Sequence, residues 1–421
     1  MFPTEPAAVN KGFSAVLRNR NFMLVWIGQI ICQLADKIFF VLTIALLDKY
    51  PLAAGVIEAD DGRRADLFLA FTLPAILLGS LGGIIVDRFP KKPIMIGSDL
   101  LRGLLTIAIP FLPREFLILL AITFANSVIV QFFAPAEQAA IPILVKRDNL
   151  MAANALFTST MMGAIIIGFA IGEPLLSFGQ SWLGDKYGQE LIVGGLYLLS
   201  SLIKVPAKLK SSKPDNKKEK VNPLEEFKDC LRYLKKKRLI MNAMVQLTAL
   251  YCVFASLVAL SIRLAARFGL QEKQFGFFLA AAGVGMVLGA GILGHWGEKF
   301  HHKPLPLFGF LSMAFVLAVF TFIENLPLAL ALSTLLGLGA ALIAVPMQTL
   351  IQQQTPPEMH GKMFGFQNHA VNIALTAPLL ITERLTNYFG LRPVLLGISF
   401  IVATIGIWAW HNTRKVLTDV I

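Results

Sequence analysis

One sequence pattern occurs twice in this chain, and each copy lies at the end of a long apolar run. The first copy, residues 83–93, carries an aspartate, an arginine and two lysines, and the second copy, residues 291–304, has His295 in place of the aspartate. A second motif repeats as well, because Gln138 and Gln348 occupy matching positions 210 residues apart. A membrane chain built from two such repeats is typical of transporters that hold their substrate between related halves.

Apolar runs of membrane-spanning length recur along the whole sequence. A helix that crosses a bilayer needs about 20 apolar residues. Hydrophobic residues make up 56% of this chain and charged residues only 15%, whereas soluble domains are about 25% charged. We therefore predict an all-α membrane protein with twelve transmembrane helices, over residues 21–47, 66–86, 93–112, 115–135, 151–173, 190–206, 239–264, 275–296, 304–323, 327–349, 363–382 and 391–411.

A long polar, lysine-rich segment separates the sixth apolar run from the seventh. We predict a six-helix N-terminal half at residues 1–203, a basic cytoplasmic linker at 204–238, and a pseudo-symmetric six-helix C-terminal half at 239–421. Lysine and arginine are concentrated in this linker and in the loops on the side of both termini. The positive-inside rule therefore places both termini in the cytoplasm.

The net charge of +12 is explained by this topology and by attraction to anionic membrane lipids. Nucleic-acid binding is not expected, because the lysine-rich stretch 211–220 contains no aromatic residue on which bases could stack. The sequence also lacks a phosphate-binding loop and a cluster with metal-ligand spacing. We therefore expect neither an enzyme nor a cofactor. The short outer loops and the three cysteines suit a monomer in a bacterial inner membrane.

The loop between the second and third runs resembles the signature loop of the major facilitator superfamily. The twelve runs, the two halves and the degenerate second copy extend this resemblance over nearly the whole chain. It implies the fold of that superfamily, alternating access, and a latch that closes the cytoplasmic side. The alternatives are static anchoring of the loop and, for the two residues of the third run, extension of the side chain to the membrane surface or a local ion pair. The latch residues that the resemblance implies are Gly83, Asp87, Arg88, Lys91, Lys92, Asp99 and Arg102.

Residues 19–36, 135–154 and 348–365 resemble the macrolide-efflux type of drug:proton antiporter. The resemblance implies proton-coupled efflux of amphipathic or drug-like small molecules. Lysophospholipid transporters share parts of the first two stretches, so a lysophospholipid transporter or flippase is the alternative function. A membrane scaffold or receptor that has lost transport is the second alternative.

Ionisable residues inside the apolar runs are candidates for proton and substrate sites, because charge is unfavourable in lipid. Asp36, in the first run, is the first choice for a proton-binding residue that faces a central cavity. A structural ion pair with a lysine or arginine of another helix is the alternative. The neighbouring Lys37 points about 100° away from Asp36 on a helix and is a candidate for substrate contact.

Four further candidates each have a structural alternative. Glu137 is either a gate or proton relay, or a solvated helix end. Glu173 replaces a glycine of the antiporter pattern and is either a proton site or an interfacial residue. Arg263 either faces an anionic headgroup or extends to the membrane surface. His369 titrates in the physiological range, or it is a structural hydrogen-bonding residue.

Overall fold

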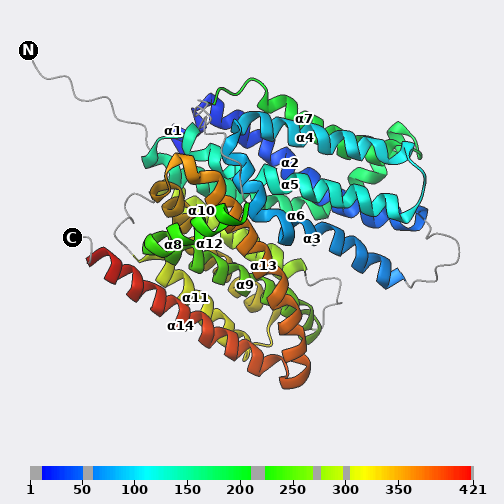
Figure 1. Cartoon of the computed structure of the whole chain (residues 1–421). Helices are drawn as coiled ribbons and strands as arrows, with labels where there is room; N and C mark the ends of the chain where they lie inside the picture. The colour runs from blue at the N-terminus through cyan, green and yellow to red at the C-terminus, as the bar shows by residue number, and fades with distance from the viewer. Residues whose placement is uncertain (1–11, 51–59, 210–222, 269–275, 297–303, 419–421) are drawn as a thin grey trace, which may run out of the picture.

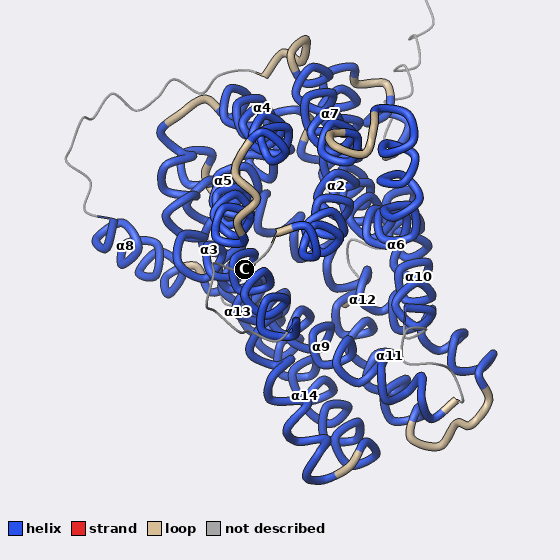
Figure 2. The backbone as a smooth tube through the Cα atoms, turned by 90° about the vertical axis from the view of Figure 1, so that its right-hand side faces the viewer, coloured by secondary structure: helices blue, strands red, loops and turns tan. Residues whose placement is uncertain are grey.

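The computed structural model describes residues 12–50, 60–209, 223–268, 276–296 and 304–418, and within these ranges all regular secondary structure is helical (Figures 1 and 2). Part of the second copy of the repeated pattern, residues 297–303, lies outside the described residues. So does most of the lysine-rich stretch of the predicted linker, residues 210–222.

Twelve long helices occupy the positions of the twelve predicted runs. Those of the N-terminal half are α2 (Arg20–Leu46), α3 (Asp60–Arg88), α4 (Lys91–Ala108), α5 (Phe116–Leu144), α6 (Leu150–Leu183) and α7 (Gly188–Lys204). Those of the C-terminal half are α9 (Arg238–Arg267), α10 (Gly276–Trp296), α11 (Leu305–Phe320), α12 (Leu326–Gln354), α13 (His360–Phe389) and α14 (Leu391–Thr418). Nine helices in the described residues are long and apolar enough to cross a membrane, and the count of twelve crossings stays a prediction.

Two additional helices lie outside the predicted runs. The short α1 (Phe13–Leu17) precedes α2, and α8 (Pro223–Lys236) follows the lysine-rich stretch of the predicted linker. Lys204, the first residue of that predicted linker, is the last residue of α7, and its side chain is fully buried. The polar segment therefore contributes a buried cation and a packed helix.

The surface of the bundle is hydrocarbon-like, and its helices approach one another at small residues. Leu117, Phe322 and Phe400 are 72%, 77% and 72% exposed, which is favourable in lipid because the acyl chains are as apolar as these side chains. Between α4 and α7, Gly103 and Gly194 pack backbone against backbone. Small residues permit this close approach, so helices in the membrane associate through close van der Waals packing.

The halves have separate hydrophobic cores and meet along two pairs of helices. One buried cluster gathers mainly side chains of α2–α7, and the other gathers mainly side chains of α9–α14. Between the halves, α3 packs against α13 and α6 packs against α10. Figure 1 shows the helices of the halves side by side near α1 and the end of α14, and diverging toward the opposite end. We call the first end, where α3 ends and α13 begins, the closed end.

Candidate functional site

Asp87, the next-to-last residue of α3, joins the two halves at the closed end. Its carboxylate accepts hydrogen bonds from the backbone N–H groups of Gly361 and Lys362, the latter at 2.7 Å, in the first turn of α13. Lys91 Nζ lies 3.5 Å from the same carboxylate. The unpaired amides and the dipole at a helix start attract negative charge. The aspartate of the signature loop therefore caps a helix of the opposite half.

Gly83, one turn before Asp87, lets the backbones of α3 and α13 touch. A methyl group at this position would overlap the carbonyl oxygen of Gly361 and the backbone of Gly365. Any larger residue at Gly83 would push the two helices apart. Of the other predicted latch residues, Arg88 is exposed at the end of α3 and Lys92 is partly buried in the first turn of α4.

Amide side chains add further hydrogen bonds between the halves near the same end. Gln348 Nε2 donates to Gln138 Oε1 at 3.4 Å, between α12 and α5. Asn154 and Gln352 pair between α6 and α12, with Asn154 Nδ2 donating to Gln352 Oε1 at 2.7 Å and Gln352 Nε2 donating back at 3.1 Å. These contacts hold the closed end together without charge.

The N-terminal segment packs against the part of the second copy that lies on α10. The ring of Phe13 packs directly on Gly294, next to His295 at the end of α10. The backbone N–H of Gly12 donates to Asn149 Oδ1 at 3.1 Å, just before α6. Phe13 also contacts both hydrophobic cores. In the first copy, Asp87 connects the two halves. In the second copy, α1 makes the connection, because it contacts Gly294 of α10 and Asn149 before α6.

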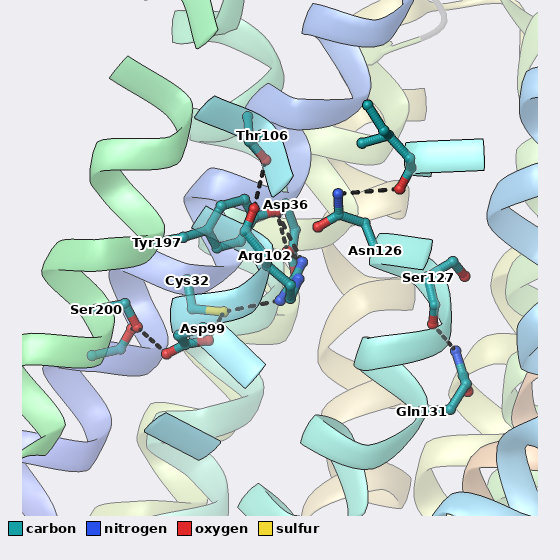
Figure 3. Close-up of polar contacts among 12 residues, drawn as sticks. Cys32, Asp36, Asp99, Arg102, Thr106, Asn126, Ser127, Gln131, Tyr197 and Ser200 are labelled. Atoms are coloured by element: carbon teal, nitrogen blue, oxygen red, sulfur yellow. Dashed lines mark hydrogen bonds and ion pairs between the residues drawn. The ribbon is translucent and has the colours of Figure 1, made fainter. Parts of the chain in front are cut away.

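Asp36 is part of a buried polar network inside the N-terminal half (Figure 3). It forms an ion pair with Arg102 of α4. Tyr197 of α7 donates a hydrogen bond to Asp36 Oδ1 at 2.8 Å, and Arg102 Nη2 lies 2.9 Å from the same hydroxyl. The Asp36 side chain retains 22% exposure, while Arg102 is 3% exposed. The structure thus shows the ion pair that the sequence left as an alternative.

A second buried ion pair lies next to the first. Lys204 Nζ is 2.7 Å from Asp99 Oδ2, and neither side chain is exposed. Ser200 donates to the same oxygen at 2.7 Å, and Cys32 Sγ lies 3.3 Å from Asp99 Oδ1. Arg102 Nη1 donates to Cys32 Sγ at 3.4 Å, so the two pairs form one network across α2, α4 and α7.

This network corrects two expectations for Asp99 and Arg102. Within the described residues they do not pair with each other, and their ion-pair partners lie on α2 and α7 and not in the signature loop. Residues three positions apart share one face of a helix, and this face of α4 is turned into the interior of the half. Each charge there finds a partner on another helix, because an unpaired buried charge is strongly unfavourable.

Glu137 is buried, which contradicts the interpretation as a solvated helix end. Helix α5 continues through Pro135 and Pro142 to Leu144, so Glu137 lies inside it. Glu137 is only 5% exposed, and its Oε1 has no hydrogen-bond partner among the described residues. The interpretations as a gate or a proton relay remain open.

The remaining candidates lie apart from the network. Lys37 packs its aliphatic stem on Gly168 of α6, and Glu173 is exposed on the same helix. Arg263 donates a hydrogen bond to Asn387 of α13. His369 packs against α3 at the contact between the halves.

Sequence reasoning missed the contribution of α7 to the network. Tyr197, Ser200 and Lys204 follow one another at intervals of three and four residues, which places them on one face of a helix. A polar face on the shortest apolar run was the available signal for a buried site. Cys32 lies one turn before Asp36, and this spacing places both residues on one face of the helix.

The fold and the site define a multi-pass integral membrane protein of two related halves, with a buried network of charges inside the N-terminal half. A sequence profile of the Major Facilitator Superfamily matches residues 25–377 and, separately, residues 243–418. The chain belongs to this superfamily and is a membrane transporter, not an enzyme.

Curated relatives and solved structures agree with this assignment. The chain is 25% identical over 419 residues to a multi-drug resistance efflux pump PmrA homolog of Lactococcus lactis subsp. lactis (strain IL1403), covering 94% of this chain and 96% of the relative. It is 27% identical to the enterobactin exporter EntS of Escherichia coli O1:K1 / APEC, covering 72% of each chain.

Among solved structures, the fold is similar to that of the human organic anion transporter MFSD10 (TETRAN), with a TM-score of 0.71, 16% identity, and coverage of 93% of this chain and 99% of that one. It is also similar to FucP in the outward conformation, with a TM-score of 0.67, 16% identity, and coverage of 94% and 99%. At these identities, the structures support the fold alone.

Proposed function

We propose that this protein exports amphipathic or drug-like small molecules by alternating access, coupled to protons. The observation that carries this proposal is the arrangement of the halves, which are joined by Asp87 and by amide pairs at one end and diverge toward the other (Figure 1). Contacts that must break for the closed end to open allow a rocking motion between two states. The names of the efflux and exporter relatives support outward transport.

The pair of Asp36 and Arg102 is the proposed entry point for protons. Asp36 is the partly exposed member of the network, at 22%, and it is held by one guanidinium and one hydroxyl. Protonation would remove its charge and weaken its pairing with Arg102, which would change the balance between two arrangements of the N-terminal half. Asp99, the other carboxylate of the network, does not share this role, because its side chain is fully buried.

The closed end is proposed to face the cytoplasm, with both termini there, in a bacterial inner membrane. The exposed cations of α8, which include Lys228, Arg232 and Lys235, support this orientation through the positive-inside rule. They also support contact with anionic lipids. We propose that the transporter works as a monomer, because each half completes its own core within one chain.

Transport into sealed proteoliposomes with an imposed pH gradient tests the function. A hydrophobic cationic dye and a labelled lysophospholipid are offered in parallel to the wild type, to Asp36→Asn, and to Asp36→Glu, which keeps the acid. We expect dye movement that follows the pH gradient, is lost in Asp36→Asn and is retained in Asp36→Glu. Lysophospholipid movement that does not depend on the pH gradient would instead support the flippase. If neither probe moves, the result would support the scaffold.

A further inference from the structure

We propose that Glu137 holds the coupling proton while the closed end is shut. The inference rests on the proposed proton-coupled transport and names the residue that carries the proton through the conformational change. Asp36, which is already paired, would receive protons from the open side, and Glu137 would release them at the closed end when it opens.

The surroundings of Glu137 favour a neutral carboxyl group. The residue is 5% exposed, and Oε1 has no partner within hydrogen-bonding distance in the described part of the chain. A buried polar group without a partner is unfavourable, and an unpaired buried charge is more so. A proton on Glu137 removes that charge, so the protonated acid is the form that fits this site.

The nearby charges do not supply a counter-ion for Glu137. The charged groups that interact electrostatically with it are Lys204 of α7, Asp99 and Arg102 of α4, and Asp36 of α2. Each of the two cations already forms an ion pair with one of these two aspartates. The two ion pairs together carry no net charge. An ionised Glu137 would therefore give the cluster a net negative charge.

Lys204 connects Glu137 to the rest of the network. Its ammonium group lies 4.5 Å from the centre of the Phe133 ring. Phe133 and Glu137 are four residues apart on α5, so they lie on the same face of the helix. Glu137 therefore lies on the face of α5 that is turned to this network, one turn closer than Phe133 to the end of the helix at Leu144.

The turn of α5 that carries Glu137 adjoins the contact between the halves, which explains how the proton would leave. The next residue, Gln138, accepts a hydrogen bond from Gln348 of the other half. Ala139 belongs to the hydrophobic core of the C-terminal half. Separation of the halves at this end admits water to this turn of α5. The O–H bond of Glu137 then breaks, the proton passes to water, and the hydrated carboxylate remains.

Infrared spectroscopy of the purified, full-length protein detects this proton directly. A buried protonated carboxyl group has a C=O band distinct from that of a carboxylate. We expect one such band at neutral pH that is lost in Glu137→Gln, shifted in Glu137→Asp and unchanged in Glu190→Gln. Glu190 is the matched control, because it is also 5% exposed but lies in the first turn of α7, outside the network.

Transport measurements separate this inference from the proposed function. In proteoliposomes, Glu137→Gln should lose dye movement driven by the pH gradient and keep exchange of dye across vesicles without a gradient. Glu190→Gln should keep both. A Glu137→Gln variant that retains the wild-type response to the pH gradient overturns the inference and leaves the proposed function intact. A wild type that does not respond to the gradient overturns the proposed coupling, while the infrared band still decides whether Glu137 is protonated.

Discussion

Gln138 and Gln348 contact each other across the two halves, with Gln348 Nε2 3.4 Å from Gln138 Oε1. They are the matching glutamines of the internal repeat, 210 positions apart. When matching residues of two related units touch each other, the contact lies at the axis that relates the units. This pair therefore marks the pseudo-symmetry axis near the closed end.

Asp87→Asn should favour opening of the closed end. The substitution keeps the size of the side chain but removes the charge that caps α13 and pairs with Lys91. A loss of about 1–2 kcal/mol corresponds to a roughly 5- to 30-fold shift in the equilibrium. The distance between spin labels at Phe89 and Glu358 measures the shift. Asp148→Asn, at an exposed position, is the control, and an unchanged distance distribution in Asp87→Asn would refute the latch.

Gly83→Ala should weaken the contact between α3 and α13. The added methyl group would overlap the backbone of Gly361 and Gly365, and overpacking of this kind costs about 1–3 kcal/mol. We expect a lower Tm in detergent and a larger open population in the spin-label experiment. Gly97→Ala is the matched control, because nothing lies within 4 Å of a methyl group at that position. Equal effects of the two substitutions would contradict the close approach.

Arg102→Met should destabilise the N-terminal half strongly, because it leaves Asp36 without its cation. Removing one member of a buried pair costs about 3–5 kcal/mol, whereas removing both costs much less. The double variant Asp36→Asn/Arg102→Met should therefore recover most of the loss in Tm. Additive effects of the two substitutions would show that the residues do not act as a pair.

Phe13→Ala should loosen the closed end at the second copy of the repeat. Phe13 packs on Gly294 and on both hydrophobic cores, so its truncation removes apolar contact that joins the halves. Losing a buried phenylalanine costs about 3–5 kcal/mol, and less at this partly buried position. Leu17→Ala serves as the control, because Leu17 is 43% exposed. Spin labels on α6 and α10 would report the opening, which the control should not produce.

Cys230 should react slowly with alkylating reagents at pH 8 while α8 is packed on the bundle. Burial raises the pKa of its thiol to about 11, and the thiolate is the reactive form. The rate should therefore increase as the pH rises toward that value. In a variant with Cys230 as the sole cysteine, Leu234→Ala should speed the reaction at pH 8, because Leu234 is buried on the same face of α8. An equal rate in both proteins would indicate that α8 does not stay packed.

Much of this architecture could be predicted from the order of residues along the chain. The lengths of the apolar runs determined where the long helices lie, since each must satisfy its backbone hydrogen bonds within lipid. The repeat determined that two related halves exist. The mismatch between Asp87 and His295 indicated that the two copies of the signature loop differ. These features are local or periodic, so they are visible without any knowledge of contacts.

The pairing of charges was decided only by the tertiary structure. Asp36 and Arg102, or Asp99 and Lys204, are far apart in sequence, and nothing local specifies which carboxylate meets which cation. The helices α2, α4 and α7 bring them together through the close packing of small residues. The same packing leaves Glu137 Oε1 without a hydrogen-bond partner among the described residues. The sequence by itself determined where the long apolar helices lie, because hydrophobicity acts along the chain. Only the tertiary structure decided which buried charges neutralise each other, because that depends on the faces that the helices present.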